Sequence, residues 1–342
     1  MGKKWKMVTI TRTLTLDNLI TRFLSSRRYL SQRSVEYYQT CLSGLEWFAQ
    51  REGWPPLEEL SREHISGFLG YVATEKHRWG GSGRRTTYKK ASPATVYHYA
   101  KVLKFFFSWA KDEEYLTKNP AVRLELPRPH YRQIEPYSNE EVKDMLDTCE
   151  HDIEHHHRYL GIRNCAIISL FIDAGLRLSE LAGLKLSDLD PQLRQARIMG
   201  KGAKLRVIPI NGSARKALKK YLTLARQPGG DKLWQTDDGQ PLSRCSIKTM
   251  VNRLKRRAGV KSGGGAHRFR HYFATHCLDN GMDLNTLRLL LGHATLNMVI
   301  HYSQYVDVQK ALVEHEKFSP LDSLMRGGNH NRGDDGWGWK DK

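Results

Sequence analysis

The chain has 342 residues, of which 39% are hydrophobic and 27% charged, a balance typical of a folded globular protein rather than a disordered one. Its 55 Lys and Arg residues outnumber 36 Asp and Glu residues, which leaves a net charge of +19. A surplus of this size is self-repelling unless a polyanion neutralises it, so nucleic acid is the first candidate partner and an anionic membrane surface the second.

The sequence predicts neither export nor membrane anchoring. The opening "MGKKWKMVTITRTL" lacks the apolar segment of a secretory signal, and the most apolar stretch, "CAIISLFIDAG", is far too short to span a bilayer. The five cysteines include no CxxC pair, which argues against a disulfide framework and against a structural zinc site. We therefore expect a cytoplasmic protein in a reducing compartment.

Residues from about 15 to 118 are predicted to form four helices. Apolar residues recur at three-and-four spacing in "SVEYYQTCLSGLEWFA" and again in "SPATVYHYAKVLKFFFSWA", where Ser92 suits the N-cap and Pro93 the first helical position. Residues 77–91 are glycine-rich and basic without an apolar period, which indicates a loop. Its cations could either close on a phosphate backbone or remain solvated; they are Arg84, Arg85, Lys89 and Lys90.

A proline-rich stretch divides the chain. Four prolines fall within "NPAVRLELPRPHYRQIEPYS", a density that forbids a continuous helix, and "SNEE" from Ser138 to Glu141 is then the capping box of a new helix. We predict a helical domain at residues 1–120, a linker at 121–137 and a second domain at 138–325. The polar, glycine-rich residues 326–342 are predicted to be a disordered tail.

The second domain is predicted to be mostly helical with one β-hairpin. "QARIMGKGAKLRVIPI" has two short β-rich runs around a glycine-containing turn. The later helix "SRCSIKTMVNRLKRRAGV" has an apolar stripe and, beside it, a basic stripe of Arg244, Lys248 and Lys255 that could face a nucleic acid groove or only solvent. The predicted fold class is therefore mainly α with a small antiparallel β-sheet.

Three short motifs of the second domain could carry chemistry. In "AGLRLSELAGL", Arg177 and Glu180 share a helical face beside leucines, either as a structural ion pair or as an anion clamp oriented by the glutamate. Lys201 stands between two glycines at the hairpin tip, as a solvated side chain or as a mobile cation that reaches a ligand. In "AHRFRHYFATH", His267 and Arg270 share a helix face, which is usually just an exposed polar surface.

One histidine cluster could in principle bind a metal ion. It lies in "HDIEHHHRYL", where a solvated polar stretch is the plainer interpretation. The chain also shows no obvious carboxylate cluster for a metal. We predict no metal site and no cofactor.

The order and joint presence of these motifs resemble the tyrosine recombinase (phage integrase) family, and most closely Xer-type recombinases and simple integrases. "GLRLSELAGL", "GKGAKLRVIPI", "HRFRHYFATHCLDNGMDLNTLRLLLGHA" and "HYSQY" match the family's motifs almost position for position. The resemblance implies a helical SAM-like core-binding domain followed by a mixed α/β catalytic domain. It also implies a site-specific DNA recombinase that cuts and rejoins strands by transesterification through a 3′-phosphotyrosine.

The resemblance assigns roles to particular residues. Tyr302, nine residues after the histidine of "LGHA", is the nucleophile, whereas Tyr305 is helix packing. The other implied catalytic residues are Arg177 and Arg270 as the phosphate clamp, Lys201 as the general acid, His267 as the helper in removing the tyrosine proton, and His293 as a hydrogen-bond donor to the phosphate. Glu180 is the implied orienting residue, and the basic helix resembles the family's DNA-reading helix.

The implied partner is double-stranded DNA with inverted-repeat core sites. The resemblance also implies that the protein is associated with the nucleoid and belongs to a mobile element. A homo-tetramer, or a hetero-tetramer with a paralogue, would join two such sites. Helix-forming sequence from about residue 15 leaves no room for the arm-binding domain of larger integrases. Three other functions fit parts of the pattern: a type IB topoisomerase-like nicking and closing enzyme, a DNA-binding protein without catalysis, and a metal-dependent nuclease.

Overall fold

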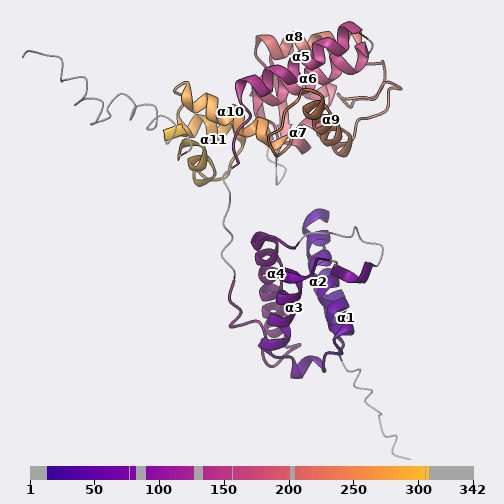
Figure 1. Ribbon diagram of the computed structural model, residues 1–342, viewed down its shortest axis with the longest axis vertical. Helices are drawn as coiled ribbons and strands as arrows, with labels where there is room; N and C mark the ends of the chain where they lie inside the picture. Colours follow the sequence, from indigo (N-terminus) through magenta and orange to yellow (C-terminus); the bar gives the residue numbers. More distant parts are fainter. Residues whose placement is uncertain are drawn as a thin grey trace, which may run out of the picture. The chain divides into compact units, whose positions relative to one another are not determined.

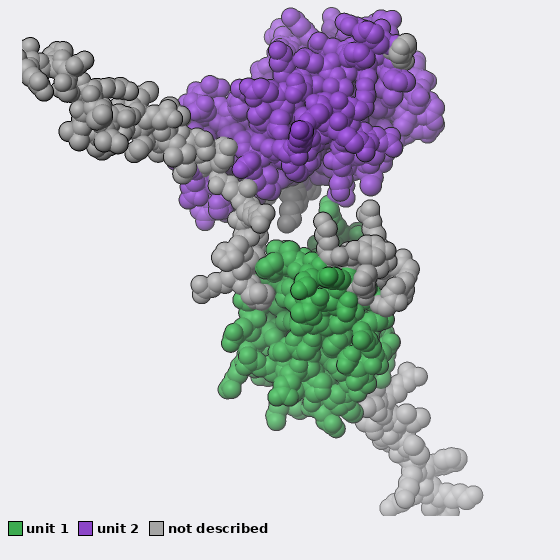
Figure 2. Space-filling model, viewed as in Figure 1, with its two compact units in different colours: residues 1–132 green, residues 133–342 purple. Residues whose placement is uncertain are grey.

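The computed structural model describes residues 14–76, 78–81, 90–126, 134–155, 157–200, 205–304 and 306–307. The chain divides into two compact units, Met1–Arg132 and Gln133–Lys342, which Figure 2 shows in different colours. The division falls within the proline-rich stretch at 121–137. The predicted tail at 326–342 lies outside the described residues.

Unit 1 is a helical bundle. Its helices are α1 (Leu16–Ser26), α2 (Gln32–Arg51), α3 (Arg62–Thr74) and α4 (Pro93–Asp112), with 3₁₀ turns at Leu57–Glu59 and Arg78–Gly81 (Figure 1). As the sequence predicts, Ser92 caps α4 through its hydroxyl, and Pro93 is the first helical residue. The apolar faces of the helices meet in an aromatic core, in which Phe23 packs edge-on against Phe106 at 5.3 Å between ring centroids.

Unit 2 is built around one buried helix. Its helices are α5 (Asn139–His155), α6 (Arg158–Ala174), α7 (Leu178–Gly183), α8 (Gly212–Leu224), α9 (Arg244–Arg257), α10 (His267–Asp279) and α11 (Leu284–Leu291), with a 3₁₀ turn at Leu186–Asp188. Helix α6 contacts α5, α8 and α10 (Figure 1), and its core-facing residues include Ile167, Ile168 and Phe171. In the described parts of the chain, every helix is too short or too polar to cross a membrane.

The described strands form one antiparallel hairpin. Strand β1 (Gln195–Met199) pairs with β2 (Leu205–Pro209), and the register places Ala196 opposite Ile208 and Ile198 opposite Arg206. Ala196, Ile198 and Ile208 are buried, so one face of the hairpin packs on the unit's core. The predicted fold class, mainly α with a small antiparallel sheet, is confirmed. The turn at 201–204, which includes Lys201, lies outside the described residues.

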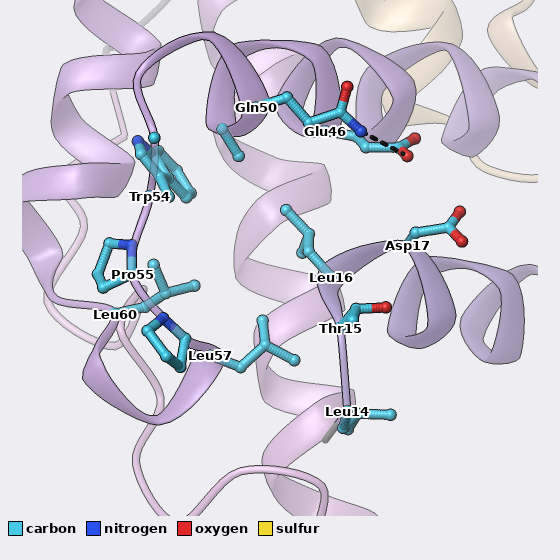
Figure 3. A pocket seen from close by; sticks show the side chains of 13 residues that line it. Leu14, Thr15, Leu16, Asp17, Glu46, Gln50, Trp54, Pro55, Leu57 and Leu60 are labelled. Carbon is cyan, nitrogen blue, oxygen red and sulfur yellow. Dashed lines mark hydrogen bonds between the residues drawn. The ribbon is translucent and has the colours of Figure 1, made fainter. Parts of the chain in front are cut away.

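Unit 1 contains a hollow of about 460 Å³ at the start of α1. Figure 3 shows it lined by apolar side chains such as Leu16, Trp54 and Leu57, with Glu46 hydrogen-bonded to Gln50 at its edge. None of the residues predicted to carry chemistry lines this hollow. The clustered reactive side chains lie instead in unit 2.

Candidate active site

The site begins where α6 ends. Gly175 caps α6 in the left-handed region at φ +56, and a Cβ there would come within 2.4 Å of the Phe273 ring, so only glycine fits the turn. Arg177 follows as the N-cap of α7, with Leu176 and Leu181 buried on either side of it in the sequence. The tight turn and the two leucines hold Arg177 at a fixed place on the surface of the core.

Glu180 is the anionic centre of the site. Its carboxylate accepts hydrogen bonds from the Arg177 backbone N–H at 2.9 Å and from Arg177 Nη1 at 2.8 Å. Arg206, on β2, adds two more, with Nη1 at 3.0 Å and Nη2 at 2.8 Å from the two carboxylate oxygens. Burial raises the pKa of Glu180, but the hydrogen bonds and charges of the two arginines outweigh burial and hold the pKa at about 2. Glu180 is therefore ionised.

Arg270, in the first turn of α10, reaches the ends of two other helices. Its side chain is only 1% exposed, and its Nη1 lies 4.0 Å from Glu180. Nη1 donates to the Gly175 carbonyl at the end of α6 (2.8 Å), and Nη2 donates to the Leu291 carbonyl at the end of α11 (2.7 Å). Helix C-termini carry partial negative charge, so these contacts stabilise a buried cation. Burial, and then the charge of Arg177, lower the Arg270 pKa to about 10.

His293 has a defined tautomer. Its Nε2 lies 2.6 Å from Arg270 Nη2, and because a guanidinium only donates, Nε2 must be the acceptor. Burial, followed by the charges of Arg270 and Arg177, lowers the His293 pKa to about 4. The neutral ring therefore carries its proton on Nδ1, which is buried and has no hydrogen-bond partner among the described residues. That N–H is free to donate to a ligand.

Tyr302 lies in the same cluster, on the helical residues 297–304. It is 7% exposed, and its ring is 5.0 Å from that of His271 and 6.3 Å from that of His293. Burial raises the Tyr302 pKa, while the charge and hydrogen bond of Arg270 and the charge of Arg177 lower it. Tyr302 thus lies near the Arg270 guanidinium, whose other neighbours are His293 and Glu180. Tyr305 lies outside the described residues.

His267 is the first residue of α10 and is exposed at the opening of the cluster. Its ring centroid lies 5.0 Å from that of His271. Partial burial, and then the charges of Arg270 and Arg177, lower the His267 pKa. The imidazole can therefore act as a neutral proton acceptor near neutral pH.

The charges of this cluster do not cancel. Three guanidinium groups, of Arg177, Arg206 and Arg270, surround the single carboxylate of Glu180, so three positive charges and one negative leave +2. Uncompensated buried charge is costly, and pre-aimed guanidinium forks match phosphate oxygens. The arrangement is suited to binding an oxyanion next to the Tyr302 hydroxyl.

The remaining predicted residues are not among the side chains that form this cluster in the described ranges. Arg84, Arg85, Lys89 and Lys201 are outside those ranges, and Lys90 is exposed in unit 1. Arg244 and Lys248 are exposed on α9, as the sequence predicts.

The placement of Lys255 on the exposed basic stripe of α9 is wrong. Its side chain is buried, and its ammonium donates to the Ser262 carbonyl at 2.6 Å and the Gly264 carbonyl at 2.9 Å. Helical spacing located the residue correctly, but the loop that follows α9 folds back and supplies carbonyl acceptors. Lys255 therefore holds that loop and does not face a groove.

Metal ligands do not gather in the described residues, where no group of three His, Cys, Asp or Glu side chains could hold an ion. Of the histidine run at 151–157, His151 and His155 stack on one face of α5 with ring centroids 4.2 Å apart.

Sequence reasoning missed Arg206 and His271. Arg206 had a detectable signal, because strand alternation places it on the same face as Ile208, which packs on the core. An arginine on the buried face of a strand requires an anionic or carbonyl partner. His271 had no comparable signal, since its contact with Tyr302 depends on how residues 297–304 fold back.

Known proteins are similar to this chain in sequence. The model of the phage integrase family matches residues 137–309. The tyrosine recombinase XerC of Shewanella amazonensis is 32% identical over 278 residues, which cover 81% of this chain and 86% of the relative. The tyrosine recombinase XerD of Oceanobacillus iheyensis is 27% identical, with 82% and 90% covered.

Solved structures agree at the level of the fold. The XerH site-specific recombinase bound to palindromic difH substrate, in a post-cleavage complex, matches with a TM-score of 0.67 and 21% identity, covering 90% of this chain and 85% of that one. A lambda integrase (75–356) dimer bound to a COC′ core site matches with a TM-score of 0.64 and 19% identity, covering 84% and 95%.

Proposed function

The chain belongs to the phage integrase family and is a tyrosine recombinase, an enzyme of site-specific DNA recombination, and we propose that Tyr302 is its nucleophile. In this reaction the phenolate oxygen bonds to the scissile phosphorus, the bond to the 5′-oxygen breaks, and a 3′-phosphotyrosine results. The observation that supports the assignment is the surplus of two positive charges around Glu180, close enough to Tyr302 for Arg270 and Arg177 to lower its pKa.

Arg177 and Arg270 are proposed to bind the non-bridging oxygens of the scissile phosphate. Negative charge develops there during phosphoryl transfer, and pre-aimed donors of this kind typically contribute ~3–4 kcal/mol each. Arg177, with 30% of its side chain exposed, can reach incoming DNA directly. Arg270 lies at the buried base of the cluster, where it contacts His293 and lowers the pKa of Tyr302.

The proton transfers are assigned to three residues. Tyr302 must lose its proton although burial raises its pKa, so a nearby neutral base is required; His267 has the lowered pKa and the exposure for that role. His293 donates its free Nδ1–H to a phosphate oxygen. Lys201, as general acid for the 5′-oxygen, is carried over from the family resemblance, as its position lies outside the described residues.

DNA binding follows from the family, and the finer assembly is part of the proposal. We assign residues 1–120 to core-binding, 121–137 to a linker and 138–325 to catalysis, with Arg84, Arg85, Lys89, Lys90, Arg244 and Lys248 contacting the DNA backbone. The proposed substrate has inverted-repeat core sites, two of which are joined by four protomers, all copies of this chain or paired with a paralogue. Such an enzyme would work at the nucleoid.

A covalent-adduct assay tests the nucleophile. Core sites are selected from a random duplex pool by binding, then rebuilt with a nick beside the scissile phosphate, so that the cleaved end diffuses away and the adduct accumulates. We expect a protein–DNA adduct that resists denaturant with the wild type and none with Tyr302→Phe, which lacks only the hydroxyl. Adduct formation by Tyr302→Phe would overturn the assignment.

A two-site assay tests strand exchange. Two duplexes that carry the selected site and differently marked arms are incubated with the wild type. Reciprocal products are expected from a recombinase, whereas relaxation of supercoils without any exchanged product would indicate topoisomerase-like nicking and closing.

A further inference from the structure

The Arg206 side chain is hydrogen-bonded within the site and is mostly shielded from solvent. Its side chain is 11% exposed, and three of its five N–H groups have protein acceptors. Two bind the two oxygens of Glu180, and Nε donates to the Leu290 carbonyl in the last turn of α11 at 2.9 Å. With its fork committed to Glu180, the side chain is poorly placed to bind DNA itself.

We propose that Arg206 is a positioning residue for strand cleavage, which fixes the phosphate-binding Arg177 through Glu180 and fixes His293 through the end of α11. This inference rests on the proposed function, because it concerns groups assigned there to the scissile phosphate.

The first connection runs through Glu180. A two-pronged guanidinium–carboxylate pair fixes the plane of both partners. The same carboxylate then accepts from the Arg177 side chain and from the Arg177 backbone N–H, so its plane determines where the Arg177 guanidinium points. Without Arg206, Glu180 would lose its two hydrogen bonds from β2 and could rotate. Arg177 would follow it.

The second connection runs through Gly292. This residue caps α11 at φ +64, and a Cβ there would lie 3.0 Å from Arg206 Nη1. The glycine is therefore required twice, for the left-handed turn and for the space that the Arg206 guanidinium fills. His293 comes next in the chain, so the packing of Arg206 against Gly292 fixes the position of the His293 backbone and, through it, of the imidazole.

Arg206 thereby joins the β-hairpin to both halves of the phosphate site. A displacement of about 1 Å at a reacting group can cost about 100-fold in rate. Loss of Arg206 should therefore slow cleavage even though the residue touches neither the phosphate nor Tyr302.

The test compares Arg206→Lys with the wild type on two nicked substrates, one with the ordinary scissile phosphodiester and one with a methylphosphonate. The methylphosphonate replaces a charged oxygen by a methyl group, so the link is neutral and correctly aimed cations matter less. Single-turnover rates are scaled to the fraction of enzyme that forms adduct. Arg257→Lys is the matched control, because Arg257 also forms a two-pronged pair, with Asp152 on α5, a helix that carries no residue of the cluster.

We expect Arg206→Lys to cut the phosphodiester about 10- to 100-fold more slowly than the wild type and to come within about 3-fold of it on the methylphosphonate. Arg177→Ala should show the same dependence on substrate, and Arg257→Lys should show none. Equal slowing of Arg206→Lys on both substrates, or no slowing on the phosphodiester, would overturn the inference.

A second variant covers the case in which Arg206→Lys does not fold. Gly292→Ala presses on the same guanidinium from the α11 side, and it should reproduce the substrate dependence. Equal slowing of Gly292→Ala on both substrates would count against the inference. Adduct formation by the wild type and its loss in Tyr302→Phe uphold the proposed function in either case, so the two ideas fail separately.

Discussion

Replacing Glu180 by glutamine should destabilise unit 2 by about 3 kcal/mol at pH 7. The carboxylate has a side chain only 4% exposed and lies among three guanidinium groups. Moving its pKa from the ordinary 4.5 to about 2 corresponds to about 3 kcal/mol in favour of the folded state. Removing one partner of a buried ion pair costs a similar ~3–5 kcal/mol. In the glutamine variant, the side-chain amide would also place its own N–H group against arginine N–H groups that need an acceptor.

The pH dependence separates this electrostatic origin from simple loss of packing. Because the folded pKa of Glu180 is depressed, its stabilisation is complete above about pH 4.5 and is lost as the pH falls towards 2. The stability difference between wild type and Glu180→Gln should therefore shrink over that range. This stability difference can be measured by urea unfolding followed by pulsed hydrogen exchange. Reading only peptides from unit 2 keeps the unfolding of unit 1 out of the measurement. Glu150→Gln, at an exposed position on α5, is the control. A difference below about 1 kcal/mol at pH 7, or one unchanged down to pH 2, would refute the reasoning.

Three further predictions follow from the site and from α9. Lys255→Met should destabilise unit 2 and leave the salt dependence of DNA binding unchanged. Arg244→Ala and Lys248→Ala should each lower the slope of log affinity against log salt concentration by about 1. An equal change of slope for Lys255→Met would contradict the buried position of Lys255. Because the folded His293 pKa is depressed, the unfolded chain binds more protons than the folded chain between about pH 6.5 and 4. Acidification over that range should therefore destabilise the wild type more than His293→Gln. Identical pH profiles of the two proteins in urea titrations would count against this prediction. Cleavage of the nicked substrate should proceed at an unchanged rate in EDTA, and its abolition would point to a metal-dependent nuclease.

Local patterns in the sequence were sufficient for the helices and for the hairpin. The stripe that includes Leu42, Leu45 and Phe48 is buried as its spacing predicts, and Ser92 and Pro93 begin α4. These features depend on residues within a few positions of one another, which helical and strand periodicity describes directly. Lys255 shows where such reasoning stops, since its environment is set by a loop that starts several residues later.

The residues of the site were identified by resemblance, and their geometry could not be derived from spacing. Arg177, Arg270 and Tyr302 lie on three separate elements, and each looks like an ordinary surface or core residue by itself. What brings them together is long-range: the Gly175 and Leu291 carbonyls at two helix ends receive one guanidinium, and that contact has no signature in either segment alone.

The placement of Glu180 explains how such a site can be both preorganised and cationic. Three closely spaced guanidinium groups without an anion would repel one another and would need to be solvated, whereas full neutralisation would leave nothing to attract a phosphate. One ionised carboxylate beneath the cluster lowers the repulsion and keeps a surplus of +2. Because Glu180 is 4% exposed and lies under Arg177, DNA approaching from solvent meets the cations first. In the proposed function, the carboxylate would orient the arginines while its own charge is turned away from the phosphate, so that they could stabilise the negative charge of the transition state more than that of the bound substrate.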